Sequence, residues 1–145
     1  MAGALVKKVS RKLGGREVLG TSIRSQAELS MAVRERIPVA ALEAVRQAGI
    51  SEQEIGTFVI PHRTRRHRIV KNERLTVEES DRVVRLLRIQ TLAEESFEDK
   101  VKANRWLRRR LAELGGNTPL EVAATETGAR VIETILGKIA WGAAA

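Results

Sequence analysis

Three copies of the helix-start pattern Ser/Thr-x-x-Glu are the feature of this sequence that most constrains its fold. The copies are Ser51–Glu54, Thr76–Glu79 and Thr118–Glu121. In such a capping box the hydroxyl accepts a hydrogen bond from the backbone N–H three residues on, and the Glu side chain accepts one from the N-cap N–H. Apolar residues follow with helical spacing, and no segment alternates apolar and polar residues with a period of two. We therefore predict an all-α fold.

Residues 38–71 have the order of a helix-turn-helix. Pro38 suits the first turn of a supporting helix, which Gly49 would end in a left-handed conformation. The box at Ser51 starts a second, short helix. A turn at residues 59–61, Val-Ile-Pro in place of the usual glycine turn, then leads into HRTRRHRIVKN, a strongly basic and helix-compatible segment.

Longer helices are predicted downstream. One begins at Thr76, with Gln90 as a satisfied polar group on its apolar arc. The next covers residues 97–114 and stops at the Gly-Gly pair that follows. Thr125 is predicted to cap the last helix. The apolar positions of these three helices are Val83, Leu86, Leu87, Ala93 and Phe97, then Ala103, Leu107, Leu111 and Leu114, then Ile132, Ile135, Leu136 and Ile139.

The whole chain has a net charge of +8, and the positive charge is concentrated in its N-terminal half. Residues 1–75 hold 15 Lys and Arg against 7 Asp and Glu. Residues 76–110 hold 9 against 7, and residues 111–145 hold 2 against 4. We therefore expect a polyanionic partner at the N-terminal half, and a different partner or only a hydrophobic core at the last third.

The basic segment of residues 62–72 contains no acidic residue. The third helix of a helix-turn-helix enters the DNA major groove, and the planar guanidinium group suits both guanine edges and phosphates. RNA is disfavoured because single-strand readers need aromatic platforms, whereas the chain has two Phe, two Trp and no Tyr. A solvated charged face is the alternative interpretation. The candidate DNA-binding residues are Arg63, Thr64, Arg65, Arg66, His67, Arg68 and Lys71.

No catalytic or metal site can be nominated. His62 and His67 are five residues apart, whereas a zinc-binding helix pairs histidines four apart. The chain has no Cys, which excludes disulfides and thiolate ligands and fits a reducing cytoplasm. No run reaches the roughly 18 apolar residues of a membrane span, and no signal peptide is recognisable. We expect a cytoplasmic, non-enzymatic protein that uses no cofactor or metal and binds no membrane.

Residues 105–142 read RWLRRRLAELGGNTPLEVAATETGARVIETILGKIAWG. This succession of W-L, L-G-G-x-T-P-L-E, T-E-x-G-A-R, L-G-x-I and an aromatic-glycine pair resembles the C-terminal toxin-binding domain of the Xre-type antitoxins of Xre-RES (MbcA/ParS-like) systems. Upstream, Ile60-Pro61, Arg63-Thr64, Arg68 and residues 75–82 extend the resemblance to roughly residues 38–142. The chain departs from the family at RRRLAE, where members often have a Pro-Asn turn.

The resemblance implies an antitoxin of a type II toxin-antitoxin system. In that family the toxin resembles ADP-ribosyltransferases and depletes NAD, the antitoxin blocks the toxin's cleft with its C-terminal domain, and the complex represses its own promoter. The implied partners are a cognate RES-domain toxin, double-stranded operator DNA and a second copy of the chain in a homodimer. The candidate toxin-binding residues are Trp106, Asn117, Thr118, Glu121, Arg130, Lys138, Trp141 and Gly142.

The two tryptophans also have a simpler interpretation, since both could close a small helical core. That interpretation is equally good for Trp106 but weaker for Trp141, which lies near the end of the sequence and would form an aromatic anchor at an interface.

The predicted organisation has three parts: a basic, partly flexible extension over residues 1–37, a helix-turn-helix domain over residues 38–95 and a helical toxin-binding domain over residues 96–145. Two other functions stay open. One is a stand-alone dimeric transcriptional regulator whose C-terminal domain only dimerises it, and the other is a small hydrolase or transferase.

Overall fold

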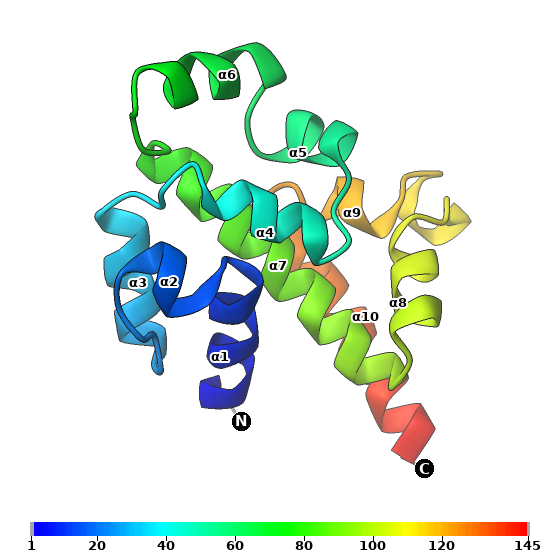
Figure 1. The fold of residues 1–145 in the computed structure, drawn as a ribbon. Helices are drawn as coiled ribbons and strands as arrows, with labels where there is room; N and C mark the ends of the chain where they lie inside the picture. Colours follow the sequence, from blue (N-terminus) through cyan, green and yellow to red (C-terminus); the bar gives the residue numbers. More distant parts are fainter. Residues whose placement is uncertain (1, 145) are drawn as a thin grey trace. The chain divides into compact units, whose positions relative to one another are not determined.

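A computed structural model describes residues 2–144, and every regular element in that range is a helix. The predicted all-α fold is confirmed. The chain divides into two compact units, one up to Val84 and one from Arg85 onward. The division falls within the long helix α7, Val77–Phe97, which is labelled in Figure 1. The predicted boundary at residues 95 and 96 lies further along this helix than the division between the units.

Unit 1 contains six helices before α7 among the described residues. They are α1 (Ala2–Lys12), α2 (Gly15–Leu19), α3 (Gln26–Arg34), α4 (Ala41–Gln47), α5 (Glu52–Phe58) and α6 (His62–Val70). α1 packs against α2, α3 and α4, and α4 packs against α5. The buried apolar side chains that join them include Val9, Leu13, Leu29, Leu42, Val45, Ile55 and Leu75.

The N-terminal segment differs from the expected basic, partly flexible extension. Residues 2–34 fold into α1, α2 and α3, and the side chains of Val6, Val9 and Leu13 are buried in unit 1. Val6 and Val9 lie on one face of α1, and Leu13, in the turn directly after it, continues the same row because the three positions are spaced by three and four residues. The basic residues between them occupy the other face, so α1 is an amphipathic part of the core.

Unit 2 continues from α7 with α8 (Lys100–Leu107), the 3-10 helix η1 (Ala112–Leu114), α9 (Pro119–Val122) and α10 (Glu126–Ala144). α9 packs against both α8 and α10. The core of unit 2 combines Leu87, Ile89 and Ala93 of α7 with Leu107, Leu120, Ile132 and Leu136. The predicted satisfied polar group is confirmed: Gln90 is fully buried and its Nε2 donates to Asn104 Oδ1 at 3.0 Å.

The predicted helix over residues 97–114 is wrong. Glu98 adopts a left-handed φ of 53°, and the Asp99 side chain then accepts from Lys102 N at 3.0 Å to start the separate helix α8. Beyond Leu107 the chain turns, and Leu111 is extended with its N–H bonded to Asn117 O at 3.2 Å. The apolar residues over this range have helical spacing although the chain is interrupted twice. A new capped helix and a tight turn can still direct these side chains into the core, so the spacing alone predicted one continuous helix.

All three predicted capping boxes are confirmed. Gly49 has the predicted left-handed φ, at 106°, and Thr125 Oγ1 accepts from Gly128 N at 3.0 Å to cap α10. Gly128 is required for this close turn, because a Cβ there would lie 1.7 Å from Val122 O.

Candidate functional site

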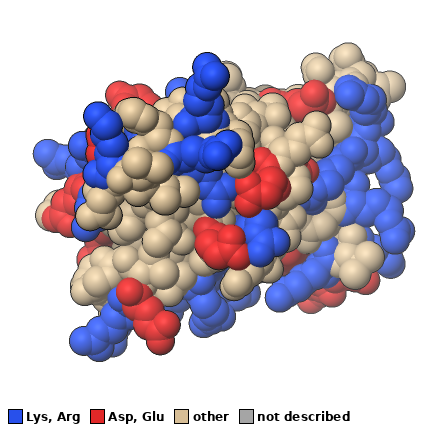
Figure 2. Space-filling view, turned by 45° about the horizontal axis from the view of Figure 1, so that its top comes forward, with Lys and Arg blue, Asp and Glu red and all other residues tan. Residues whose placement is uncertain are grey.

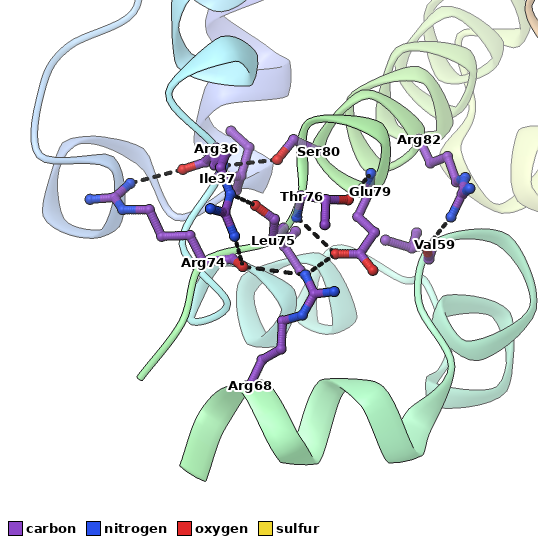
Figure 3. Close-up of polar contacts among 10 residues, drawn as sticks. All are labelled: Arg36, Ile37, Val59, Arg68, Arg74, Leu75, Thr76, Glu79, Ser80 and Arg82. Carbon is purple, nitrogen blue, oxygen red and sulfur yellow. Dashed lines mark hydrogen bonds and ion pairs between the residues drawn. The ribbon is translucent and has the colours of Figure 1, made fainter. Parts of the chain in front are cut away.

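The basic helix α6 follows α5 through a turn that packing and hydrogen bonds hold in place. Val59 and Ile60 are buried, and the N–H groups of both donate to Ile55 O. Arg82 Nη1 of α7 donates to Val59 O at 3.1 Å, as Figure 3 shows. This turn therefore needs no glycine: buried apolar residues replace it, and Pro61 then stands at the N-cap of α6.

One side of α6 is attached to the rest of unit 1 by ion pairs. No side chain of this helix is buried, so it has no apolar anchor. Arg65 Nη1 lies 2.7 Å from Glu52 Oε2 of α5, and Arg68 Nη1 pairs with Glu79 Oε1 of α7. The side chains of Arg65 and Arg68 are only 12% and 16% exposed. Two of the four predicted DNA-binding arginines, Arg65 and Arg68, are thus engaged within the protein.

Glu79 itself is held from several sides. Its carboxylate accepts from Thr76 N at 2.8 Å in the capping box of α7 as well as from Arg68. Arg68 Nη1 also donates to Arg74 O at 3.3 Å. Figure 3 shows the Arg68 side chain pointing from α6 toward Glu79 and the start of α7. The orientation of α6 is therefore coupled to the first turn of α7.

A reciprocal arginine clamp fixes the loop before α7. Arg36 Nε donates to Leu75 O at 2.7 Å and its Nη2 to Arg74 O at 3.0 Å, while Arg74 Nη1 donates to Arg36 O at 2.9 Å. Ile37 N donates to Ser80 Oγ at 2.9 Å beneath them. Arg36 has a left-handed φ of 73°, an uncommon conformation for a residue with a Cβ. These bonds join residues 36–37 to residues 74–80 (Figure 3).

The opposite side of α6 is open. Arg63, Arg66, His67 and Lys71 are exposed, whereas Thr64 is half-buried on the inner side with Arg65 and Arg68. Residues four apart share a helix face, so Val70 lies on the same face as Arg66. It is 84% exposed. Val70 is not among the residues predicted to bind DNA, although its spacing of four residues from Arg66 was the available signal.

In unit 2 the two tryptophans have different environments. Trp106 is half-buried, and its ring lies 5.6 Å from that of Phe97 at an angle of 48°. Trp141 is 78% exposed on the last part of α10. Arg130, Thr134, Gly137 and Lys138 are also exposed and share its face of that helix, which continues past Gly142.

The other candidate toxin-binding residues form the turn before α9. Asn117 Nδ2 donates to Leu114 O at 3.1 Å, and Thr118 and Glu121 form the capping box. The backbone hydrogen bond from Thr118 is the main cause that lowers the pKa of the exposed Glu121 carboxyl, and Arg110 at 3.5 Å acts in the same direction. These polar groups already have partners in the fold, so they contribute to the shape of the turn.

Positive charge by itself does not distinguish one surface. Figure 2 shows Lys and Arg gathered along the right-hand edge, the side on which α8 lies in Figure 1. Unit 2 carries six cations between residues 100 and 110, namely Lys100, Lys102, Arg105, Arg108, Arg109 and Arg110. Two features distinguish α6 from the other basic segments. It follows a capped helix, and the ion pairs on its inner side hold its other face toward solvent.

Within residues 2–144, no group of three or more His, Asp or Glu side chains is arranged to hold a metal ion. In the same described range, no helix combines the length and the apolar character that a membrane span requires.

Comparison with known proteins identifies both halves of this arrangement. Residues 28–88 match the model of the antitoxin Xre-like helix-turn-helix domain, and residues 92–142 match that of the antitoxin Xre/MbcA/ParS C-terminal toxin-binding domain. The first match ends and the second begins within α7. The first begins inside α3, so part of the predicted extension belongs to the helix-turn-helix match.

Curated relatives agree with the domain models. The chain is 39% identical over 84 residues to an antitoxin Xre of Pseudomonas putida, a match that covers 58% of this chain and 53% of the relative. It is 34% identical over 84 residues to an antitoxin Xre of Yersinia enterocolitica, covering 57% of each. A match to an antitoxin Xre of Photorhabdus laumondii is 36% identical over 70 residues and covers 48% and 47%. The chain thus spans about half the length of the curated relatives it matches. With its helix-turn-helix domain followed by a toxin-binding domain, the chain belongs to the Xre-type antitoxin family.

Proposed function

We propose that this protein is the antitoxin of a type II toxin-antitoxin system, in which unit 2 binds and blocks an NAD-depleting RES-domain toxin and unit 1 represses the operon. The proposal is carried by the presence of both family domains in one chain, each formed as a compact unit. The protein acts by binding, as a homodimer on paired half-sites of its operator, and catalyses no reaction itself.

The DNA-binding surface is the outward face of α6. Arg63, Arg66, His67 and Lys71 reach the major groove and its phosphates, while Arg65, Arg68 and Thr64 support the helix from within. Exposure supports this division, because the first four side chains are open to solvent and the two inner arginines are engaged with Glu52 and Glu79.

Two charge-matched double variants test this surface. R63Q/R66Q removes two exposed cations from α6, and R105Q/R109Q removes two exposed cations from α8 and the turn after it. Binding to DNA from the protein's own promoter is measured by fluorescence anisotropy at several salt concentrations. We expect R63Q/R66Q to lower the affinity at least about tenfold and to reduce the salt slope, by about 0.9 for each phosphate that the variant no longer neutralises. Equal reductions in affinity for the two variants would show a net-charge effect only, and would contradict the assignment of α6.

The toxin-binding surface is the exposed face of α10 that carries Trp141, Lys138 and Arg130. A large exposed tryptophan on a rigid helix is the kind of anchor that dominates protein interfaces. Trp106 supports unit 2 through its contact with Phe97, and the Asn117–Glu121 turn shapes the adjacent end of the domain.

Co-expression with the product of the adjacent reading frame tests this half. We expect Trp141→Ala to weaken toxin binding at least about 30-fold, the effect of losing roughly 2 kcal/mol at a hot spot, and to abolish rescue of growth. Val101→Ala is the control, because Val101 is also an exposed apolar residue of unit 2, 67% exposed on α8. If no toxin co-purifies with the unaltered chain while DNA binding persists, the protein is instead a stand-alone regulator.

A further inference from the structure

Val70 is the most exposed large hydrophobic residue of the described chain, at 84%. It ends α6, a helix whose other outward side chains are charged or are imidazoles. Leaving an apolar side chain in water on a basic helix brings no stability to the fold. The exposure of Val70 is therefore better explained by a contact between the outward face of α6 and a binding partner.

The two ion pairs determine which way Val70 points. Arg65 pairs with Glu52 and Arg68 with Glu79, and both pairs lie on the inner side of α6. Figure 3 shows that the Arg68 side chain runs from α6 toward α7. Val70 is two residues beyond Arg68, so it projects about 200° around the helix from it. It is thus directed outward, above Arg66 on the preceding turn.

The outward face has the length of a major-groove contact. Arg63, Arg66 and Val70 are spaced by three and four residues, so they form one row about 10 Å long at 1.5 Å per residue. The major groove of B-DNA is about 12 Å wide. A helix lying in the groove with its two arginines near the bases would bring the Val70 methyl groups to the same groove floor or wall.

We propose that Val70 is a specificity-determining residue that contacts the 5-methyl group of a thymine in the operator. In the major groove the thymine methyl is the one apolar group that a base pair presents, and apolar side chains recognise it by contact. This proposal rests on the proposed DNA binding by the outward face of α6. It adds the class of base pair read there: an A·T pair next to the bases or phosphates that Arg66 contacts.

Deoxyuridine provides a direct test, because it differs from thymidine only by lacking this methyl group. A duplex selected by the full chain from a random pool is prepared with thymidine and again with deoxyuridine throughout. Both are titrated with the unaltered protein, with Val70→Ala and with Ile69→Ala. Alanine favours helix, so loss of α6 is not expected, and circular dichroism verifies this.

Ile69 is the matched control. It is also an exposed apolar residue of α6, at 55%, but it lies about 100° around the helix and lines a groove with Pro38, Val39 and Ala40. We expect the unaltered protein and Ile69→Ala to bind the thymidine duplex about fourfold more tightly for each methyl contacted, and Val70→Ala to lose that preference. Fourfold corresponds to the roughly 0.8 kcal/mol gained on burying one carbon group.

Other outcomes overturn the proposal. If Val70→Ala keeps the full preference for thymidine, another residue contacts the methyl group. If Val70→Ala leaves this preference unchanged but weakens self-association or toxin binding, Val70 belongs to a protein interface. If the unaltered protein binds both duplexes equally and tightly, α6 binds DNA without a thymine contact. A failure of R63Q/R66Q to weaken binding would instead count against the proposed DNA binding by α6, on which this proposal rests.

Discussion

The pair formed by Arg68 and Glu79 offers a test of whether a basic residue of α6 supports the helix or contacts DNA. Glu79→Gln keeps the shape of the side chain and most of the capping box but removes the negative charge that Arg68 requires. The side chains are 16% and 9% exposed. Breaking a fully buried ion pair costs about 3–5 kcal/mol, and a hydrogen bond to a charged group contributes about 1.5–3 kcal/mol. Because Arg68 keeps some contact with solvent, we expect Glu79→Gln to lower the free energy of unfolding by about 2 kcal/mol.

The sign of the effect on DNA binding separates the two roles. Removing a negative charge near DNA should strengthen binding when nothing else changes. If Glu79 positions α6 through Arg68, however, Glu79→Gln releases the helix and weakens specific binding, by about tenfold for a decrease of roughly 1.4 kcal/mol in binding free energy. Glu78→Gln is the control: it removes the same charge one residue away on α7, where Glu78 is exposed and forms no ion pair within residues 2–144.

Chemical denaturation and DNA titration of five proteins provide the measurement. The set is the unaltered chain, R68Q, E79Q and the R68Q/E79Q double variant, with E78Q alongside. A coupling energy of at least about 1 kcal/mol between the two positions is expected, because contacting residues do not behave additively. The reasoning is refuted if E79Q strengthens DNA binding as much as E78Q does, since Arg68 would then be a DNA contact that Glu79 merely restrains.

Three further predictions concern stability. Gly128→Ala should destabilise the protein by several kcal/mol in thermal unfolding, because its Cβ would lie 1.7 Å from Val122 O, whereas Gly137→Ala, which meets open space, should be neutral or stabilise by up to about 1 kcal/mol. Glu121→Gln should make the free energy of unfolding depend less on pH in the acid range. The Glu121 carboxyl has a pKa below its ordinary 4.5 in the folded protein, so its contribution to stability is present above pH 4.5 and is lost as the pH falls through the lower, folded pKa. Leu13→Ala should cost about 2–5 kcal/mol of stability in chemical denaturation, because Leu13 is fully buried; a negligible cost would show that α1 is not part of the core.

Local patterns in the sequence predicted most of the helices correctly. A capping box needs only four consecutive residues, so Ser51, Thr76 and Thr118 fix helix starts wherever the rest of the chain lies. The spacing of apolar residues likewise identified the buried faces of α7 and α10. It failed over residues 97–114, where the break depends on the conformation of single residues, Glu98 and Asp99, and on a long-range bond from Leu111 to Asn117.

The roles of the α6 arginines could not be predicted in the same way. The inner face of an ordinary surface helix is recognised by its apolar stripe, but α6 contributes no apolar side chain to the core. Its inner face is occupied by Arg65 and Arg68, whose partners Glu52 and Glu79 are 13 and 11 residues away in sequence. Since every arginine in the segment carries the same charge, only the positions of these carboxylates distinguish a supporting arginine from an outward one.

The N-terminal segment illustrates the same limit of charge counting. The positive charges of Lys7, Lys8 and Arg11 are typical of a solvated basic tail, which is the basis on which the segment was interpreted. The feature that indicates a buried helix is the row formed by Val6, Val9 and Leu13. The cations lie between these residues in sequence, but the three apolar side chains are neighbours on one side of the folded segment. The positive excess of unit 1 therefore has two separate sources, the outer face of a core helix and the outward face of α6. Because only the second lies on the proposed recognition helix, neutralising Lys7 and Arg11 should change affinity for DNA far less than neutralising Arg63 and Arg66, even though the change in net charge is identical.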